Sequence, residues 1–506
     1  MRPTPARLTL LLFAATTGFA ATDSRLPRST PEAEGVDSAA VLSLVGALEQ
    51  RVDAVHSIML LRHGRVVAEG WWAPYAPGDL HLMYSVSKSF TSTAVGLAVQ
   101  EGRLSVDDKV LSFFPDLAPA NPAAQMKNMR VRDLLRMTTG HEHDSAPLMR
   151  ARSDGAATRA FLETDVEHKP GTHFLYDSGG PYVLAAIIQR LTGTTVEDYL
   201  QPRLFEPLGI GLHSWGRSPE GVDFGDGGIS LRTEDLAKFG QLYLQKGIWN
   251  GRRLISEKWV EAATSRQTSN GSDPNGNWDQ GYGYLFWMDK LPGFRADGAE
   301  GQFCIVLPEY DVVLAVTGGT SNMAGVMDTV WQYLPPALRY MALPPNPAAQ
   351  AGLARKLASL TLPVQGGALH SPIESKVSGR TYSLDTNERG LQSVAIDFTG
   401  ANPVLTIVDA GGRHPIACGL GQWVRGRTDF YPRISDLFAV DSQGIAACGA
   451  WAGDDTFNVK LCFDETPYTL TLSFNYTNGR LQLEWNHPLR WESNRHIQIA
   501  GHEIVR

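Results

Sequence analysis

A serine and a lysine three residues apart, Ser85 and Lys88, have the spacing in this chain that best suits covalent chemistry. They lie at the start of segment 81–102, whose apolar residues recur with helical spacing and which ends at a glycine. Because residues one turn apart share a helix face, the ammonium group can reach the hydroxyl. The free N–H groups of a helix start favour an oxyanion and a neutral lysine there. The pair therefore suggests a nucleophile and its base, although an S-x-x-K string alone also fits a solvated helix start.

Two later segments carry further groups of this kind. Tyr176 and Ser178 stand directly before the strongly apolar helical segment 181–191. Segment 295–308 (RADGAEGQFCIVLP) is a glycine-rich start of a strand. A serine–lysine pair, a later tyrosine and a glycine-containing strand, in that order, indicate a catalytic constellation and not a chance string.

Region 35–335 resembles the serine β-lactamase and penicillin-binding-protein superfamily, specifically its class C-like branch. The signatures of that superfamily are S-x-x-K, Y-x-N or Y-x-S, and K-T-G or H-T-G. They correspond to Ser85–Lys88, Tyr176–Ser178 and Ala296–Gly298. The motif surroundings LMYSVSKSF and YDSGGPYVLAAII are especially similar to the 6-aminohexanoate-dimer hydrolases and related esterases.

The resemblance implies an enzyme that hydrolyses its substrate through an acyl-enzyme on Ser85. Lys88 and Tyr176 would serve as base and proton relay, and which of the two is the formal base stays open. Ser178 would support them by a hydrogen bond that positions Lys88. The backbone N–H groups of Ser85 and Ala299 would form the oxyanion hole. The mechanism requires no metal and no organic cofactor.

The substrate strand of the resemblance includes Gly298, Gly301 and Gln302. Close approach of a substrate to the backbone would explain the two glycines, and a tight bend in the chain would explain them equally well.

Two departures from the β-lactamase pattern concern the substrate. Ser178 stands where most β-lactamases have asparagine, and Ala296 stands where β-lactam-recognising members carry lysine or histidine. That cation would bind a substrate carboxylate. Arg295 is adjacent, but neighbouring strand residues point to opposite faces, so it is a poor substitute. The sequence therefore favours a small amide or ester as the substrate. The alternatives are a β-lactamase or D,D-peptidase, and a non-catalytic binding or sensor protein on the same fold.

Strands are predicted at both ends of this region and helices between them. Hairpins are expected at 57–72 and 303–317, and a final helix around 323–334 is expected to stop at Pro335. This pattern is typical of an α+β unit in which an antiparallel sheet lies beside a helical part. The resemblance implies that this unit has the β-lactamase/transpeptidase-like fold. Beyond it, short alternating strands predict a C-terminal all-β barrel or sandwich. The predicted divisions are a signal peptide at 1–20, an N-terminal arm at 21–40, a β-lactamase-like serine hydrolase domain at 41–343, a linker at 344–367 and a C-terminal β domain at 368–506.

Charge and the N-terminus restrict the possible partners and compartment. A formal net charge of −8 over 506 residues argues against a nucleic-acid partner, which needs a basic surface. Arg2 and Arg7 precede an apolar run, 8–15, that fits a signal peptide and is too short for a stable membrane anchor. We therefore expect a secreted or periplasmic protein that acts on a small molecule. The sequence does not predict its oligomeric state.

Some residues suggest a metal site, a ligand-binding face or a disulfide, none of which the sequence establishes. The string His141–His143 contains two histidines and a glutamate, but it lacks the one-turn spacing that places two metal ligands on one helix face. Three C-terminal tryptophans could form a ligand face, although core packing is the better expectation. A disulfide among three C-terminal cysteines is compatible with an exported protein, with the pairing left open. These residues are Trp423, Trp451, Trp485, Cys418, Cys448 and Cys462.

Overall fold

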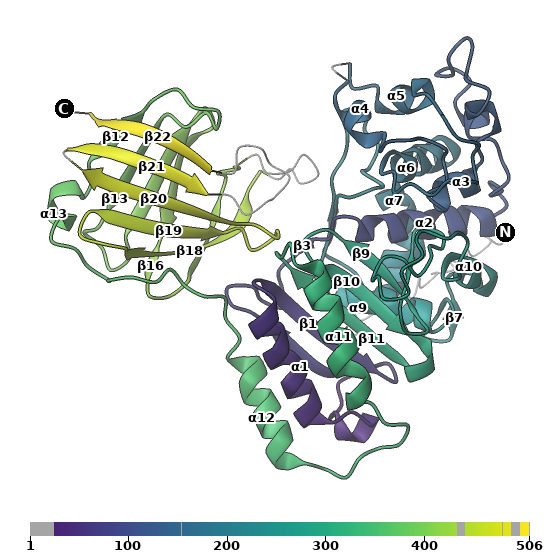
Figure 1. The fold of residues 1–506 in the computed structure, drawn as a ribbon, viewed down its shortest axis with the longest axis horizontal. Helices are drawn as coiled ribbons and strands as arrows, with labels where there is room; N and C mark the ends of the chain where they lie inside the picture. Colours follow the sequence, from purple (N-terminus) through teal and green to yellow (C-terminus); the bar gives the residue numbers. More distant parts are fainter. Residues whose placement is uncertain (1–24, 153, 433–440, 478, 487–495, 505–506) are drawn as a thin grey trace, which may run out of the picture.

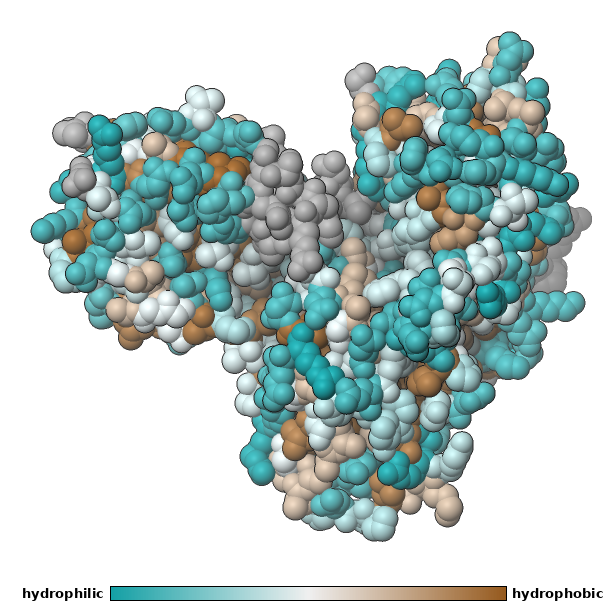
Figure 2. All heavy atoms as spheres, viewed as in Figure 1, coloured by the Kyte–Doolittle hydropathy of each residue, from teal (hydrophilic) through white to brown (hydrophobic). Residues whose placement is uncertain are grey.

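The computed structural model describes residues 25–504, except 153, 433–440, 478 and 487–495. The predicted signal peptide lies outside these residues. No helix in the described ranges is long and apolar enough to cross a bilayer. The visible face is largely hydrophilic, with hydrophobic residues scattered in small groups (Figure 2).

The two predicted hairpins join into one sheet, as expected from the α+β pattern. The first strand, β1 (Val55–Arg62), pairs antiparallel with β11 (Val312–Gly318), so the two ends of the region meet. The six-stranded sheet has the order β2-β1-β11-β10-β9-β8. Its other strands are β2 (Arg65–Trp71), β8 (Trp287–Met288), β9 (Phe294–Gly298) and β10 (Gln302–Leu307).

Both faces of this sheet are covered by helices (Figure 1). Alternate residues of β1 enter different cores: Ile58 packs toward α1 (Ser38–Arg51) and α11 (Met323–Ala337), whereas Met59 packs toward α2 (Val86–Gln100) and α9 (Thr233–Leu244). This is the two-residue period of a strand buried on both sides. The sheet is therefore a central layer, and α2 carries Ser85 at its start.

The prediction that α11 stops at Pro335 is wrong. The helix continues to Ala337 with both prolines, Pro335 and Pro336, inside its last turn. Proline has a helical φ, and it costs a helix mainly one N–H bond and a clash with the preceding turn. The Ala337 carbonyl instead accepts the backbone N–H of Asp37, which ties the helix end to the start of α1.

The helical part lies beyond one face of the central sheet. Here α2 packs against α6 (Gly179–Thr192), the helix predicted at 181–191. A three-stranded sheet, β3-β5-β4, holds the segment before Ser85. The remaining elements are β3 (His81–Leu82), α3 (Val131–Leu135), α4 (Ala146–Arg150), α5 (Ala157–Glu163), α7 (Val196–Leu200), α8 (Glu206–Leu208), β4 (Ser214–Trp215), β5 (Ile229–Leu231), β6 (Ile248–Trp249), β7 (Arg252–Arg253) and α10 (Glu257–Ala263).

The segment predicted as a linker contains a packed helix. α12 (Pro347–Ala358) buries Leu353 and lies against α1 and β2. A Cβ at Gly70 of β2 would lie 2.7 Å from a Leu360 methyl carbon and 2.9 Å from one of Leu357. The first half of the segment therefore belongs to the helical layer over the sheet.

The C-terminal strands form a nearly closed, barrel-shaped sheet, which confirms the predicted all-β domain and, of its two predicted forms, the barrel. We call strands β12–β22 the C-terminal barrel; it has α13 (Glu374–Val377) at its start, and its strand order is β15-β14-β13-β12-β22-β21-β20-β19-β18-β16, with β17 on β18. The bounds are β12 (Thr381–Leu384), β13 (Ser393–Asp397), β14 (Val404–Asp409), β15 (Gly412–Ala417), β16 (Gly419–Leu420), β17 (Val424–Thr428), β18 (Gln443–Trp451), β19 (Thr456–Cys462), β20 (Thr469–Thr477), β21 (Arg480–Asn486) and β22 (His496–Glu503).

The barrel interior accounts for most of the C-terminal residues singled out in the sequence. Trp451 and Trp485 are buried in its core, as expected for core packing. The strands β20 and β21 pair as an antiparallel hairpin. The cysteines are buried free thiols, so the disulfide that the sequence permits is not formed.

Candidate active site

Ser85 stands at the N-cap of α2, and its hydroxyl makes no capping bond to that helix. Instead, Lys88 Nζ donates a hydrogen bond to Ser85 Oγ at 2.8 Å. The helix turn that joins the two residues sets this geometry, as the three-residue spacing predicts. Ser85 is half-buried and Lys88 is buried, so the hydroxyl faces open space while the amine lies behind it.

Lys88 is held from the far side by a loop distant in sequence. Its Nζ donates a second hydrogen bond, 2.6 Å long, to the backbone carbonyl of Asp226. Burial lowers the pKa of Lys88 from 10.5 to about 8. The Asp226 carboxylate opposes that shift, and the Arg150 guanidinium adds to it. A fraction of the amine is therefore neutral near pH 8 and able to accept a proton.

Tyr176 lies on the other side of this pair. The Lys88 ammonium is 5.0 Å from the centroid of the Tyr176 ring. Burial raises the pKa of Tyr176 above its ordinary value, although the nearby Ser85 hydroxyl lowers it. Trp287 stacks on the ring at 5.3 Å between centroids. Lys88, Tyr176 and Trp287 come from distant parts of the sequence and thus meet in the fold. With its raised pKa, the Tyr176 phenol stays protonated at neutral pH.

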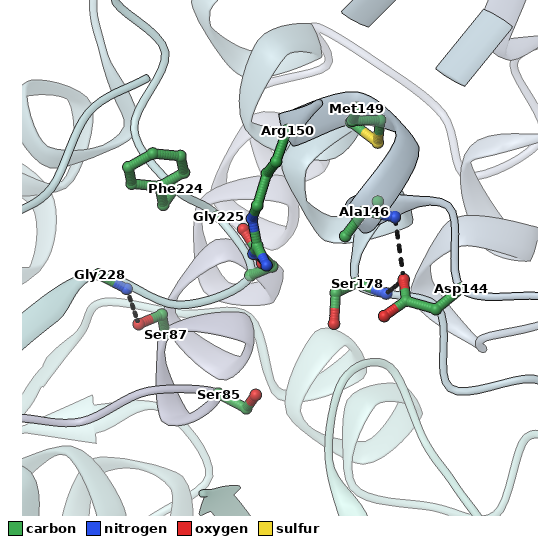
Figure 3. A network of polar contacts seen from close by, with 12 residues as sticks. Ser85, Ser87, Asp144, Ala146, Met149, Arg150, Ser178, Phe224, Gly225 and Gly228 are labelled. Carbon is green, nitrogen blue, oxygen red and sulfur yellow. Dashed lines mark hydrogen bonds and ion pairs between the residues drawn. The ribbon is translucent and has the colours of Figure 1, made fainter. Parts of the chain in front are cut away.

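The sequence predicts a hydrogen bond between Ser178 and Lys88, but the described contacts include none. Among the described contacts, Lys88 Nζ donates only to Ser85 and Asp226. The Ser178 hydroxyl points into the space that Ser85 also faces, and its backbone N–H donates to Asp144 (Figure 3). Ser178 is thus placed to contact a substrate directly.

Asp177, the middle residue of that motif, fixes the loop that precedes α4. Its buried carboxylate accepts a bond from His141 Nδ1 at 2.8 Å and two from Ser145, at its N–H and its hydroxyl. Burial alone would raise the pKa of Asp177, but these hydrogen bonds hold it below its ordinary value. The loop is therefore tied to the start of α6 beneath Tyr176.

The predicted substrate strand is β9 with its turn into β10. A Cβ at Gly298 would lie 2.2 Å from the Met83 carbonyl oxygen, so only glycine allows β9 to lie this close to the segment before Ser85. Gly301 has φ +91°, a turn requirement. The buried Gln302 side chain donates to the Ala299 carbonyl at 3.1 Å. The tight bend therefore explains Gly301, the close approach of the chain's own backbone explains Gly298, and the approach of a substrate to this strand stays a prediction.

The backbone N–H groups of Ser85 and Ala299 are available for a ligand. Across the ranges that the structure describes, neither N–H donates to another protein group. Both residues are half-buried. Two such N–H groups on neighbouring segments have the chemistry of an oxyanion hole.

Arg295 cannot replace the missing cation of the third motif. It is completely buried and forms ion pairs with Asp289 and with Asp297, the latter at 2.9 Å. Trp278 Nε1 also donates to Asp297 at 2.8 Å. Ala296 points the other way, as alternation along a strand requires. No cation of β9 is therefore free to bind a substrate carboxylate.

A cavity of about 530 Å³ opens beside the candidate site. Apolar side chains, among them Met149, Phe224 and Tyr431 of the C-terminal barrel, line it together with Ser178. Arg150 reaches into this space from α4 (Figure 3) and pairs with Asp226 at 2.5 Å. A larger cavity near the N-terminal arm contains none of the predicted site residues, so we assign substrate binding to the smaller one.

The histidines near 141 take separate roles. His141 is buried against Asp177, whereas Glu142 is exposed and bonds His168 Nε2 at 2.5 Å. Glu142, His168 and His173 hold potential ligand atoms within 4.8 Å of one another. Two sequence-distant loops, and not the string 141–143, thus form that exposed corner.

Three residues near the site carried no recognisable signal in the sequence. Asp226 contributes a backbone carbonyl, which any residue type could supply. Arg150 lies outside the three motifs, and only the fold brings it to Ser85; a basic residue on a short helix has no distinctive spacing. Tyr84 directly precedes Ser85, but a tyrosine at that position is not part of the three signatures.

Known proteins similar to this chain are hydrolases and penicillin-binding proteins. The family model described as Beta-lactamase matches residues 45–329. The 6-aminohexanoate-dimer hydrolase of Paenarthrobacter ureafaciens is 32% identical over 255 residues, which cover 47% of this chain and 65% of that protein. Penicillin-binding protein 4 of Amycolatopsis lactamdurans is 28% identical over 279 residues, covering 47% of this chain and 72% of that protein. The chain therefore spans slightly less than two thirds of the first relative.

A solved structure supports the fold. A Bacillus anthracis protein, provisionally named a 6-aminohexanoate-dimer hydrolase, aligns with a TM-score of 0.50 and 19% identity, covering 63% of this chain and 89% of its own. At this identity the likeness bears on the fold alone.

Proposed function

The chain belongs to the beta-lactamase family, and on that premise we propose that it is an exported serine hydrolase that cleaves small amides or esters. Ser85 attacks the carbonyl carbon, and its proton passes to Lys88 as the Ser85–carbon bond forms. Collapse of the tetrahedral intermediate expels the amine or alcohol, protonated from Lys88 through Tyr176. Water then attacks the acyl-enzyme and regenerates Ser85.

The single observation that carries this proposal is the 2.8 Å bond between Lys88 Nζ and Ser85 Oγ. Burial lowers the pKa of Lys88 to about 8, which matches a base working near neutral pH. Burial moves the pKa of Tyr176 the opposite way, so the phenol remains a proton donor. This difference favours Lys88 as the formal base and Tyr176 as the relay.

The surroundings of the site favour amides and esters. The buried ion pairs of Arg295 and the presence of Ala296 leave β9 without a cation for the carboxylate of a β-lactam. A relative named 6-aminohexanoate-dimer hydrolase, at 32% identity, is consistent with a linear amide substrate.

Replacing the nucleophile tests the proposal. We expect Ser85→Ala to abolish hydrolysis of p-nitrophenyl butyrate while the melting temperature stays within a few degrees of the wild type. Ser92→Ala is the matched control, because Ser92 is buried on the same helix and its hydroxyl has no hydrogen-bond partner in the described structure. Retained turnover in Ser85→Ala would reject the proposal.

A penicillin-recognising enzyme is the second candidate, supported by the 28% identity to a penicillin-binding protein. Turnover of nitrocefin, or a stable adduct with a labelled penicillin, would favour it. A protein that hydrolyses neither ester nor β-lactam and gives no adduct with a fluorophosphonate would instead be a binding protein or sensor.

A further inference from the structure

The turn between β19 and β20 is one part of the C-terminal barrel that meets the candidate active site. This turn, residues 463–468, is closed by a bond from the Phe463 N–H to the Tyr468 carbonyl at 3.0 Å. Arg425 of β17 binds its Asp464 at 2.9 Å and also pairs with Asp79. Asp79 belongs to the α/β part, as we call the described residues that precede the C-terminal barrel. The turn is therefore fixed to the barrel and lies on the side of the barrel that faces Asp79.

On that face the turn binds the segment that leads into the nucleophile. The backbone N–H of Leu82 donates to the Glu465 carbonyl at 3.0 Å. The hydroxyls of Tyr84 and Tyr468 form a hydrogen bond, and their rings meet edge to face with centroids 6.4 Å apart. Leu82 and Tyr84 are buried within the hydrophobic core of the barrel. Two of the three residues before Ser85 are thus held by the C-terminal barrel.

The second N–H of the predicted oxyanion hole belongs to Ala299, which also contacts the hydrophobic core of the barrel. Ala299 packs against the hydrophobic cluster of the barrel, although it belongs to the turn after β9. Gly298 brings this turn against the backbone of Met83. The two N–H groups therefore belong to segments that share one support.

Unusual backbone conformations adjoin both N–H groups. Tyr84, directly before Ser85, has φ +47°, and Glu300, directly after Ala299, has φ +62°. Residues other than glycine adopt this left-handed region at a cost, and they keep it where the surroundings hold them. At Tyr84 those surroundings include Tyr468.

We propose that the C-terminal barrel positions the oxyanion hole, and that Tyr468 is the positioning residue that fixes Tyr84 and hence the Ser85 N–H. This inference rests on the proposed function. Tyr468 acts through Tyr84 and does not touch the substrate. Loosening Tyr84 shifts the Ser85 N–H, which stabilises charge in the transition state more than in the bound substrate.

Tyr468→Phe tests this inference in the full-length protein, because it removes one hydroxyl and keeps the ring. We expect kcat for p-nitrophenyl butyrate to fall by about tenfold or more, as small misplacements near reacting atoms do, while KM stays within about twofold. The inhibition constant of a phenylboronic acid, whose adduct on Ser85 carries an oxyanion, should rise by a similar factor. Tyr84→Phe should give the same loss, and the double variant should lose little more than either one.

Tyr476→Phe is the matched control. Tyr476 is a barrel tyrosine whose ring contacts lie within the barrel, to Tyr382 and Trp451. It should leave kcat and boronate binding unchanged. A merely structural role for Tyr468 predicts instead a lower melting temperature with normal kcat in the folded fraction.

The outcomes separate the two proposals. A fluorophosphonate adduct on Ser85 of the wild type, with unchanged kcat and unchanged boronate binding in folded Tyr468→Phe, would overturn the positioning role alone. Absence of any adduct on Ser85 in the wild type would reject the proposed function itself.

Discussion

The α/β part and the C-terminal barrel bury different kinds of side chain. The α/β part places ionisable groups in its interior, including Lys88, Asp177 and Arg295. In the barrel, strands such as β19 and β21 alternate buried apolar and less buried polar residues. Within its described residues, Asp464 is the single Asp, Glu, Lys or Arg side chain that is buried. Burying charge is costly and is retained where it serves a purpose.

This difference helps to locate function. Several buried charges of the α/β part lie around Ser85 and on β9, among them Lys88, Asp226 and Arg295. The exception in the barrel, Asp464, lies in the turn that contacts the segment before Ser85. Burial of Asp464 raises its pKa to about 6, and the Arg425 guanidinium lowers it. In the barrel, this buried carboxylate therefore lies where the barrel approaches the candidate active site.

The largest effect on kcat should come from replacing Lys88. Lys88→Met keeps the length of the side chain in an apolar form, and we expect kcat to fall by about 10²–10⁴-fold, because the nucleophile loses its base. Melting temperature should hold or rise, since a desolvated cation is removed. Steady-state rates and a thermal scan check this, and a kcat within twofold of the wild type would remove Lys88 from the mechanism.

Stability should respond differently in the two parts. Arg295→Met leaves Asp289 and Asp297 buried without their cation, which costs about 3–5 kcal/mol. Leu483→Ala in the barrel should cost about 2–5 kcal/mol through a cavity. Urea unfolding and initial rates distinguish them, because Arg295→Met should also lower kcat, whereas folded Leu483→Ala should keep it. Equal effects on kcat would remove the contrast between the two parts.

The smallest effect concerns pH. The rate should rise with pH as Lys88 loses its proton, with a midpoint near its pKa of about 8. The Arg150 cation disfavours the charged lysine, so Arg150→Ala should raise that pKa and move the midpoint to higher pH by up to about one pH unit. Arg152→Ala is the control, because Arg152 has its own partners, Asp154 and Glu163. A kcat/KM profile that stays in place in Arg150→Ala would exclude this coupling.

Local patterns predicted the central elements well. The helical period after Ser85 and the two hairpins, 57–72 and 303–317, correspond to α2 and to four strands of one sheet. The end of α11 was not predictable from Pro335, because the helix continues through both prolines to Ala337, whose carbonyl accepts the Asp37 N–H only in the folded structure.

The predicted site was less complete than the predicted fold. Motif spacing brought Ser85, Lys88 and Tyr176 together, since each stands at a fixed point on α2 or before α6. It gave no indication of the Asp226 carbonyl or of Tyr468, because contacts between distant loops leave no period in a sequence. Segment 344–367 was predicted as a linker for the same reason, because its sequence does not reveal that α12 packs on α1.

Trapping the covalent intermediate tests the central claim most directly. The wild type is mixed with p-nitrophenyl butyrate, quenched in acid within its first turnovers, digested and analysed by mass spectrometry. We expect one butyryl group on the peptide that contains Ser85, in an amount that matches the initial burst of p-nitrophenol. Turnover with the butyryl group on another residue, or a burst with Ser85 unmodified, would contradict an acyl-enzyme on Ser85.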